Sequence, residues 1–264
     1  HGIETSLFVS NKRRDANLVR DSLATKNKVY ISSLPLSGNH RTDNELADRR
    51  SARLFATGGR IALKLENTSI AVNALLHQFE HPIQRENKAH KLFRFEGSHL
   101  FNLSLDFNHR YRNINFFGES AYASSSAMAV LSGVLIGLHR NINLSILYRN
   151  YPRNYNALDP NAFGEYASVN NERGIYMGLM LKPAVRWKVR AYLDHWESPW
   201  LRFGINQPSH GREYLFRVDY ELKRKHLFYM QMVYEEKMED YISTNNPVKK
   251  AASRERYRFR VLFN

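Results

Sequence analysis

The chain has 264 residues, a mean hydropathy of −0.54 and a formal net charge of +14. No apolar run approaches the roughly 20 residues that a membrane-spanning helix needs, and the absence of cysteine excludes disulfides, thiolate metal sites and a cysteine nucleophile. The positive charge indicates either an anionic partner, such as nucleic acid or lipopolysaccharide, or basic side chains placed in loops and in a lumen.

The chain opens directly in strand-like sequence, without an initiator methionine and without a basic-then-apolar signal segment. We therefore expect a mature product or, more in keeping with the missing methionine, a piece of a longer protein. The next segment, residues 11–51, is polar and charged. We expect it to be a long polar extracellular loop, partly helical or partly disordered. As the most basic stretch it is either a partner-contact site or simply a solvated loop.

Short alternating segments make up most of the remaining chain. In residues 99–112, apolar side chains such as Phe101, Leu103 and Leu105 recur at a spacing of two, which predicts a strand and not a helix. Successive side chains of a strand point to opposite faces, so one face of this strand is apolar and the other polar. Counting such segments predicts about twelve strands. The predicted strands are residues 2–10, 52–66, 69–80, 92–112, 113–123, 126–138, 142–152, 173–182, 187–196, 212–222, 226–237 and 254–263.

The predicted connections alternate in length, with one tight exception at 123–126. Short turns on one side and long loops on the other are typical of a membrane β-barrel, with periplasmic turns and extracellular loops. We therefore predict an all-β fold, an antiparallel transmembrane β-barrel, formed by residues 1–264 as a single domain or as the C-terminal part of a larger barrel. The short turns are 66–69, 112–113, 139–141, 182–186 and 223–225, and the long loops are 11–51, 81–91, 153–172, 197–211 and 238–253.

Assigning the apolar strand faces outward places charged side chains in the lumen. Arg190 and Asp194 on one predicted strand should face Arg217 and Asp219 on the next, which predicts interstrand ion pairs. The interior is then either an anion-attracting channel or a packed, salt-bridged core, because arginine side chains quickly fill a barrel of about twelve strands. The candidate lumen-lining residues are Arg149, Arg190, Asp194, Arg217, Asp219, Arg256, Arg258 and Arg260.

Aromatic residues, 15 Tyr, 15 Phe and 3 Trp, lie mostly in the alternating segments, and a set of tyrosines and tryptophans clusters toward the ends of the predicted strands. Amphipathic rings prefer the headgroup level of a membrane, so this clustering predicts anchoring and not ligand binding. The candidate membrane-interface aromatics are Tyr148, Trp187, Trp196, Trp200, Tyr214 and Tyr257.

The histidines and serines give no catalytic or metal-binding pattern. His77 and His81 would align on a helix, but on the predicted strand they lie roughly 13 Å apart. His99 and His109 share the apolar face of one strand, and no nucleophile context singles out a neighbouring serine. We therefore expect no catalytic residue, no cofactor and no metal, and we expect that the protein is not an enzyme.

The last segment, residues 253–264, is predicted to be a strand with apolar side chains on one face and charged side chains on the other. Tyr257, Phe259, Val261 and Phe263 point one way, and three arginines point the other. The segment resembles the closing strand of bacterial outer-membrane β-barrels, whose terminal aromatic is read by the assembly machinery. The resemblance implies that these four residues form a C-terminal assembly signal.

A second resemblance covers about residues 102–206, through the runs NLSLDFNHRYRNINFFGESAYA, LYRNYPRNYNALDPNAFGEYASVNNERGIYMGL and WKVRAYLDHWESPWLRFGINQPS. These are similar to the barrel region of Bacteroidota outer-membrane proteins whose longer members carry helix-hairpin-helix repeats before the barrel. The resemblance implies the outer membrane of a Gram-negative bacterium. It also implies a link to DNA uptake, although the repeats that bind DNA backbone are absent from this chain.

The expected function is that of an integral outer-membrane β-barrel subunit, non-enzymatic, serving transport or an envelope protein assembly. The alternatives are a nucleic-acid-handling barrel in DNA uptake and an outer-membrane hydrolase. Expected partners are outer-membrane lipid and lipopolysaccharide, the outer-membrane assembly machinery, and other envelope proteins or the missing N-terminal part of the same barrel. Nucleic acid is a further candidate partner.

Overall fold

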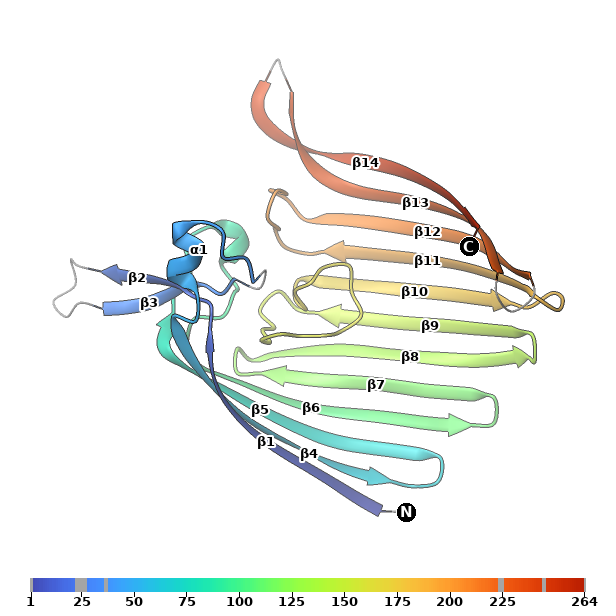
Figure 1. Cartoon of the computed structure of the whole chain (residues 1–264), viewed down its shortest axis with the longest axis horizontal. Helices are drawn as coiled ribbons and strands as arrows, with labels where there is room; N and C mark the ends of the chain where they lie inside the picture. Colours follow the sequence, from blue (N-terminus) through green and yellow to red (C-terminus); the bar gives the residue numbers. More distant parts are fainter. Residues whose placement is uncertain (1, 22–27, 36–37, 223–225, 244–245, 264) are drawn as a thin grey trace.

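The computed structural model describes residues 2–21, 28–35, 38–222, 226–243 and 246–263. Most of the chain forms one large antiparallel sheet whose long strands are neighbours in chain order, as Figure 1 shows. Its main path is β1 (Gly2–Arg14), β4 (Ala52–Lys64), β5 (Thr68–Ile83), β6 (Gly97–Tyr111), β7 (Ile114–Ala123), β8 (Ala127–His139), β9 (Ile142–Tyr151), β10 (Glu172–Leu181), β11 (Trp187–Ser198), β12 (Ser209–Leu222), β13 (His226–Ser243) and β14 (Asn246–Phe263).

The predicted all-β antiparallel fold is confirmed, and each predicted strand has a counterpart in this path. The period-two alternation is the reason, because it lets each strand present one apolar and one polar face. The strands are 10 to 18 residues long, well above the usual length of about 5–6. Among the described residues, no helix is long and apolar enough to cross a membrane.

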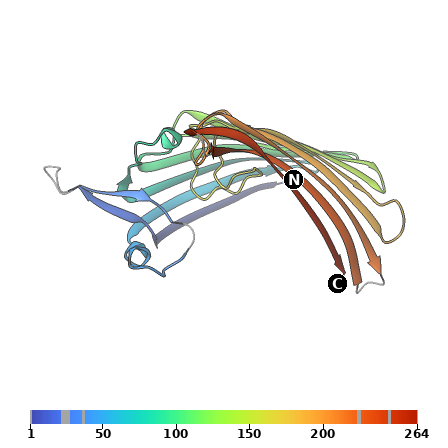
Figure 2. The same cartoon turned by 90° about the horizontal axis from the view of Figure 1, so that it is seen from above.

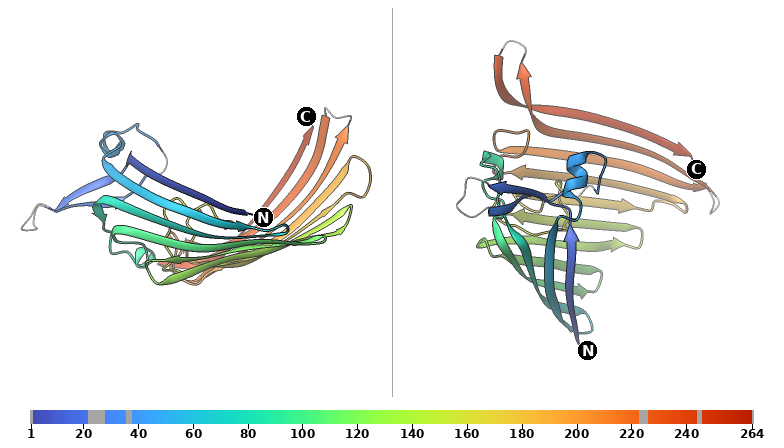
Figure 3. Two further views of the ribbon diagram at one scale, coloured as in Figure 1. Left: turned by 90° about the horizontal axis from the view of Figure 1, so that it is seen from below. Right: turned by 60° about the vertical axis from the view of Figure 1, so that its left-hand side comes forward.

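The sheet is curved and open. β1 and β14 stand at opposite ends of the strand order, and no pairing joins them among the described residues. Figures 2 and 3 show the arch from two sides, with the connection between β9 and β10 on its concave side. Closure into a barrel is therefore not seen in the structure. β1 and β14 run antiparallel, so each offers the other a complementary edge.

The connections separate by length, as predicted. Tight turns, such as 65–67 and 112–113, lie at the end of the sheet where β1 begins and β14 ends, and longer connections lie at the opposite end (Figure 1). The connection 124–126 is the predicted tight exception at the long-loop end. The predicted turn 223–225 lies outside the described residues.

Segment 11–51 is more ordered than the predicted loop. β1 continues to Arg14, a hairpin of β2 (Asn17–Asp21) and β3 (Lys28–Ser33) follows, and a short helix α1 (Asp43–Asp48) precedes β4. The hairpin joins the main sheet through one parallel bridge, Ile31 to Ile83. The sequence pattern missed this because the two strands are only 5 and 6 residues long and few of their apolar residues, such as Ile31, are buried.

The predicted long loop 238–253 is wrong. β13 runs on to Ser243 and β14 starts at Asn246, so the two strands form a hairpin that projects past its neighbours in Figure 1. Polar contacts support the extension: Arg254 pairs with Glu239 at 2.9 Å, and the Ser253 hydroxyl donates to Glu236 at 2.8 Å. Because apolar residues such as Met238 and Tyr241 do not alternate regularly with the polar ones in this part, the pattern that reveals a strand is absent. β6 also starts later than predicted, at Gly97, because a 3₁₀ turn, η1 (Ala89–Lys91), precedes it.

The two faces of the sheet differ in chemistry. The convex face exposes large apolar side chains, among them Leu7, Leu105 and Phe259. The concave face carries the charged side chains and two small apolar cores. One core lies beside the β2–β3 hairpin and includes Ala16, Ile31, Leu54, Phe79 and Leu100; the other lies beneath the β9–β10 connection and includes Ala123, Ala127, Ala129, Tyr151, Tyr155 and Val169.

Candidate functional site

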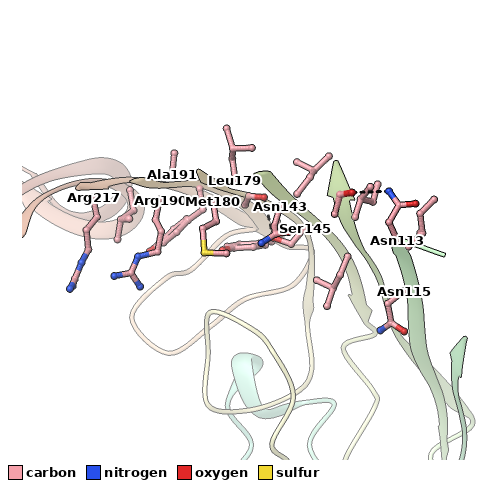
Figure 4. A pocket seen from close by; sticks show the side chains of 18 of the residues that line it. Asn113, Asn115, Asn143, Ser145, Leu179, Met180, Arg190, Ala191 and Arg217 are labelled. Carbon is pink, nitrogen blue, oxygen red and sulfur yellow. Dashed lines mark hydrogen bonds between the residues drawn. The ribbon is translucent and has the colours of Figure 1, made fainter. Parts of the chain in front are cut away.

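The eight residues predicted to line the lumen share the concave face. Figure 4 places Arg190 and Arg217 on the side of the sheet that faces the loops, and the strand registers put the other six on the same side. Arg190 stands opposite Arg217, as predicted, but Asp194 stands opposite Glu213 and not opposite Asp219. Like charges therefore align across strands, in two separate rows.

The first row, called here the arginine row, consists of Arg190, Arg217 and Arg260, with Gln231 in the same register. Asp219 is its counter-ion: its Oδ2 accepts from Arg190 Nη2 at 2.7 Å, and its Oδ1 accepts from Arg217 Nε at 2.8 Å. The Arg217 guanidinium also lies over the Tyr229 ring, 3.8 Å from the ring centre. The predicted interstrand ion pair between Arg190 and Asp219 is thus present.

The second row, called here the carboxylate row, consists of Asp194, Glu213 and Glu235 on β11, β12 and β13. It lies four residues nearer the long loops, roughly 13 Å along the strands. Glu235 lies near Arg256 Nη1 and Arg258 Nη2, at 3.4 and 3.5 Å, and Arg258 also reaches Glu213 at 3.2 Å. The carboxylate row is therefore neutralised by cations on the same face.

Arg149 is the most buried member of this network, with a side chain that has no solvent exposure. Its Nε donates to Glu172 Oε1 at 2.5 Å, and its two Nη atoms donate to the Asp194 carboxylate at 2.8 and 3.2 Å. Gly174 makes room for it, because a Cβ there would lie 2.8 Å from the Arg149 Cζ atom. A buried arginine held by two carboxylates fixes β9, β10 and β11 in register.

The β9–β10 connection, residues 152–171, is tied to the concave face by the same network. The Glu165 backbone N–H donates to Glu172 Oε1 at 3.0 Å, and the Glu165 carboxylate pairs with Lys237 on β13. Burial raises the pKa of Glu165, and the contact with Lys237 opposes that rise. The Tyr151 hydroxyl donates to the Phe163 carbonyl at 2.7 Å. The loop is therefore a packed part of the concave surface.

A cleft of about 890 Å³ opens beside the arginine row, on the side of the short turns (Figure 4). Side chains from β7, β9 and β10–β12 project from the sheet around it, with Arg190 and Arg217 at one end and Asn113 and Asn115 at the other. Polar groups between them include Ser145, whose hydroxyl donates to the Gly178 carbonyl at 3.2 Å. This hollow is larger than the one beside the second apolar core, which measures about 680 Å³, and it is the candidate binding site.

The convex face carries two rows of aromatic rings. Tyr214, Tyr234 and Tyr257 are in register on β12–β14, with ring centres 5.9 and 5.0 Å apart. Nearer the short turns, a second row crosses β11–β14 and begins with Trp187 and Tyr220, whose rings lie 4.7 Å apart. The full second row is Trp187, Tyr220, Phe228 and Phe263. The predicted interface residues Tyr148, Trp187, Tyr214 and Tyr257 all lie on this convex face with exposed side chains.

Two predicted interface aromatics do not lie there. Trp196 is 1% exposed on the concave face, against Gly211 and beneath Lys237, because its position in β11 shares the parity of Asp194. Trp200 lies beyond the end of β11 in a loop, where its Nε1 donates to the Ala89 carbonyl at 2.9 Å and its ring packs against Phe93. Neither tryptophan therefore lies on the exposed apolar face: Trp196 packs within the concave surface, and Trp200 packs in a loop contact.

The last strand has the arrangement that its alternation predicts. Tyr257, Phe259, Val261 and Phe263 lie on the convex face, and each is at least half exposed. The alternate positions of β14 carry Arg256, Arg258 and Arg260 on the concave face. Their role as an assembly signal stays a prediction.

Sequence reasoning missed the partners of the predicted lumen residues. Glu213 and Glu235 belong to the carboxylate row, Gln231 is in register with the arginine row, and Glu172 holds Arg149. Lys237 links Glu235 to the β9–β10 connection. The alternation of side chains along a strand could have placed these residues on the concave face, because each lies an even number of residues from a concave position on its own strand. Among the described residues, no three His, Asp or Glu side chains gather into a group that could hold a metal ion. No protein-family model matches the chain, and no curated protein matches it either.

Proposed function

We propose that this chain is an integral outer-membrane β-barrel subunit, non-enzymatic, that serves transport or an envelope protein assembly. The observation that carries the proposal is the convex face. Large apolar side chains there remain exposed on strand after strand, at 37–88% of their full accessibility. A soluble protein would bury such a face against a core, and monomers rarely expose contiguous apolar patches of more than a few hundred Å². Hydrocarbon is the solvent in which this face is stable.

The dimensions of the convex face fit a bilayer. A spanning strand needs about 9–11 residues, and the main-path strands have 10 or more. On β12, Tyr220 lies six positions after Tyr214. The two aromatic rows are therefore roughly 20 Å apart along the strand. The side chains between them include Phe216, Val218, Met230 and Met232. An apolar band between two aromatic girdles is typical of a membrane barrel.

A bilayer location also requires that the sheet edges be satisfied. Unpaired backbone N–H and C=O groups cost several kcal/mol each in hydrocarbon, so an open edge does not persist there. β1 and β14 must therefore pair with each other or with further strands once the protein is in the membrane. Their antiparallel directions permit direct pairing.

The test is refolding of the full chain in lipid vesicles, followed by vesicle flotation and protease digestion. We expect the protein to float with the vesicles and the strands to be protected. A protein that stays monomeric and soluble without lipid or detergent would contradict the proposal. Conductance in planar bilayers then separates its two branches: a conducting protein supports transport, and an inserted but non-conducting one supports the assembly role.

A further inference from the structure

The cleft beside the arginine row has an unusual charge. Among the described residues that line it, four are arginines and none is acidic: Arg110 and Arg112 at one end, and Arg190 and Arg217 at the other. The counter-ion of the arginine row, Asp219, does not line the cleft. Its side chain is 6% exposed, and its oxygens already contact Arg190 and Arg217. The cleft is therefore a basic hollow whose walls mix apolar side chains, such as Leu144 and Met180, with a few uncharged polar ones, such as Asn115 and Ser145.

The arginine row holds more positive charge than its structure requires. Arg190 and Arg217 stand directly opposite each other, an arrangement that is destabilising across strands. One carboxylate serves both, and Arg260 makes no hydrogen bond or ion pair with the described residues. In the carboxylate row, by contrast, cations and carboxylates are matched. Among the described residues, the arginine row therefore carries a net positive charge.

Arg190 retains donors for a ligand, whereas each nitrogen of the Arg217 guanidinium already contacts Asp219 or Gln231. Arg190 uses Nε and Nη2 on Asp219 and is 44% exposed, which leaves its Nη1 hydrogens directed away from the carboxylate. Arg217 Nη1 donates to Gln231 Oε1 at 3.2 Å, so Gln231 presents its amide N–H groups to the same region. Figure 4 shows both arginines projecting from the sheet on the cleft side. Fixed, planar guanidinium groups are the usual partners of carboxylate and phosphate oxygens.

We propose that this cleft binds a small organic anion through its carboxylate or phosphate groups, with Arg190 as the main contact. Arginines at both ends favour a ligand with two charged groups, and Asn115, Asn143 and Ser145 between them provide neutral hydrogen-bonding partners. The inference deepens the proposed transport function by naming a substrate class, and in that sense rests on it. The binding site itself depends only on the folded sheet.

Isothermal titration of the refolded protein in detergent micelles, at about 0.15 M salt to screen non-specific attraction, tests the site. The probes are succinate for a carboxylate ligand, inorganic phosphate for a phosphate ligand and glucose as a neutral control. Saturable binding of either anion without glucose binding supports the proposal, and the tighter anion identifies the charged group. Absence of saturable binding by both anions overturns it.

The matched variants are R190Q in the cleft and R256Q on the same face outside it. Each removes one positive charge, and Glu235 keeps Lys237 and Arg258 when Arg256 is lost. We expect R190Q to weaken binding by at least about tenfold and R256Q by less than about twofold. Equal losses in the two variants would overturn the assignment of the cleft.

If R190Q does not refold, R190K keeps the charge that Asp219 requires and removes the planar fork. We expect about threefold weaker binding or worse, and unchanged affinity would overturn the role of Arg190. Because titration in micelles needs no bilayer, failure to insert would contradict the proposed function and failure to conduct would contradict its transport role, while this result would stand in either case. A conducting barrel that binds neither anion would contradict this inference alone.

Discussion

At the scale of single residues, Arg149 is the position whose loss should cost most. Arg149→Ala leaves Asp194 as a buried carboxylate without its cation, and leaves the buried Glu172 with only Arg202, at 3.9 Å. Breaking a buried ion pair in this way typically destabilises by about 3–5 kcal/mol. We expect a loss of that size in the free energy of unfolding, measured by urea titration of the micelle-refolded protein.

The control is Arg173→Ala, on the convex face of the adjacent strand β10. Arg173 pairs with Glu197, but its side chain is 56% exposed. An exposed pair contributes about 0–1 kcal/mol. Equal destabilisation by the two variants would show that the Arg149 network is not buried.

Gly211 should also be intolerant of a side chain. A Cβ at this position would lie 2.5 Å from the Trp196 ring and 2.8 Å from the Glu236 carbonyl oxygen. Gly211→Ala therefore forces the ring or the strand to move, at a cost of about 1–3 kcal/mol. We expect lower stability together with a change in tryptophan fluorescence. Gly2→Ala is the control, because no atom lies within 4 Å of its Cβ position; an effect as large there would contradict the packing argument.

At the scale of elements, the segment between β1 and β4 should respond to acid. The Asp15 carboxylate accepts from the Arg50 backbone N–H at 2.8 Å and contacts His40 Nε2 at 2.8 Å. These contacts hold the pKa of Asp15 below its ordinary value of 3.8. A lowered pKa means that the stabilisation is present above pH 3.8 and is lost as pH falls through the folded-state value.

Hydrogen exchange of the Arg50 amide measures this response. We expect its protection factor to be constant above pH 3.8 and to fall below it. In Asp15→Asn the carboxylate is absent, so the protection factor should no longer depend on pH in that window. A fall of equal size in Asp15→Asn would assign the effect to another group.

Elements could be predicted from the sequence wherever one face is apolar. Phe101, Leu103 and Leu105 mark β6, and Tyr257, Phe259 and Val261 mark β14, because apolar side chains at every second position share one face of a strand. The far ends of β13 and β14 lacked this signal, since polar contacts such as Glu239–Arg254 support both strands there. The β2–β3 hairpin was missed for a related reason: its apolar contacts come from single residues such as Ile31.

The sequence predicts on which face of the sheet the residues of the candidate site lie, but it does not predict most of the residues with which they pair. Parity alone places Arg190, Arg217 and Asp219 together, and it would have placed Trp196 inside had it been applied to that residue. The pairing of Arg149 with Glu172 depends on the register of β9 against β10, and that register follows a connection of twenty residues, 152–171. Side-chain types do not fix such a register, so the counter-ions of the predicted arginines required the structure.

At the scale of the whole molecule, the decisive question is which solvent covers the convex face. Leu105 on β6 is 50% exposed on the convex face, and Asn108 on the same strand is exposed on the concave face. In a bilayer, Leu105→Lys places a charge in hydrocarbon and should cost about 2–4 kcal/mol. In water, a surface substitution of this kind changes stability by only about 0.5 kcal/mol.

Urea unfolding of both variants in lipid vesicles therefore tests the location of the sheet. We expect Leu105→Lys to lose most of that amount while Asn108→Lys, whose side chain faces the aqueous interior of the proposed barrel, stays close to the wild type. The reverse order would place the concave face against lipid. Near-equal stabilities would mean that the convex face meets water or another protein, since only hydrocarbon makes one lysine so much costlier than another three residues away.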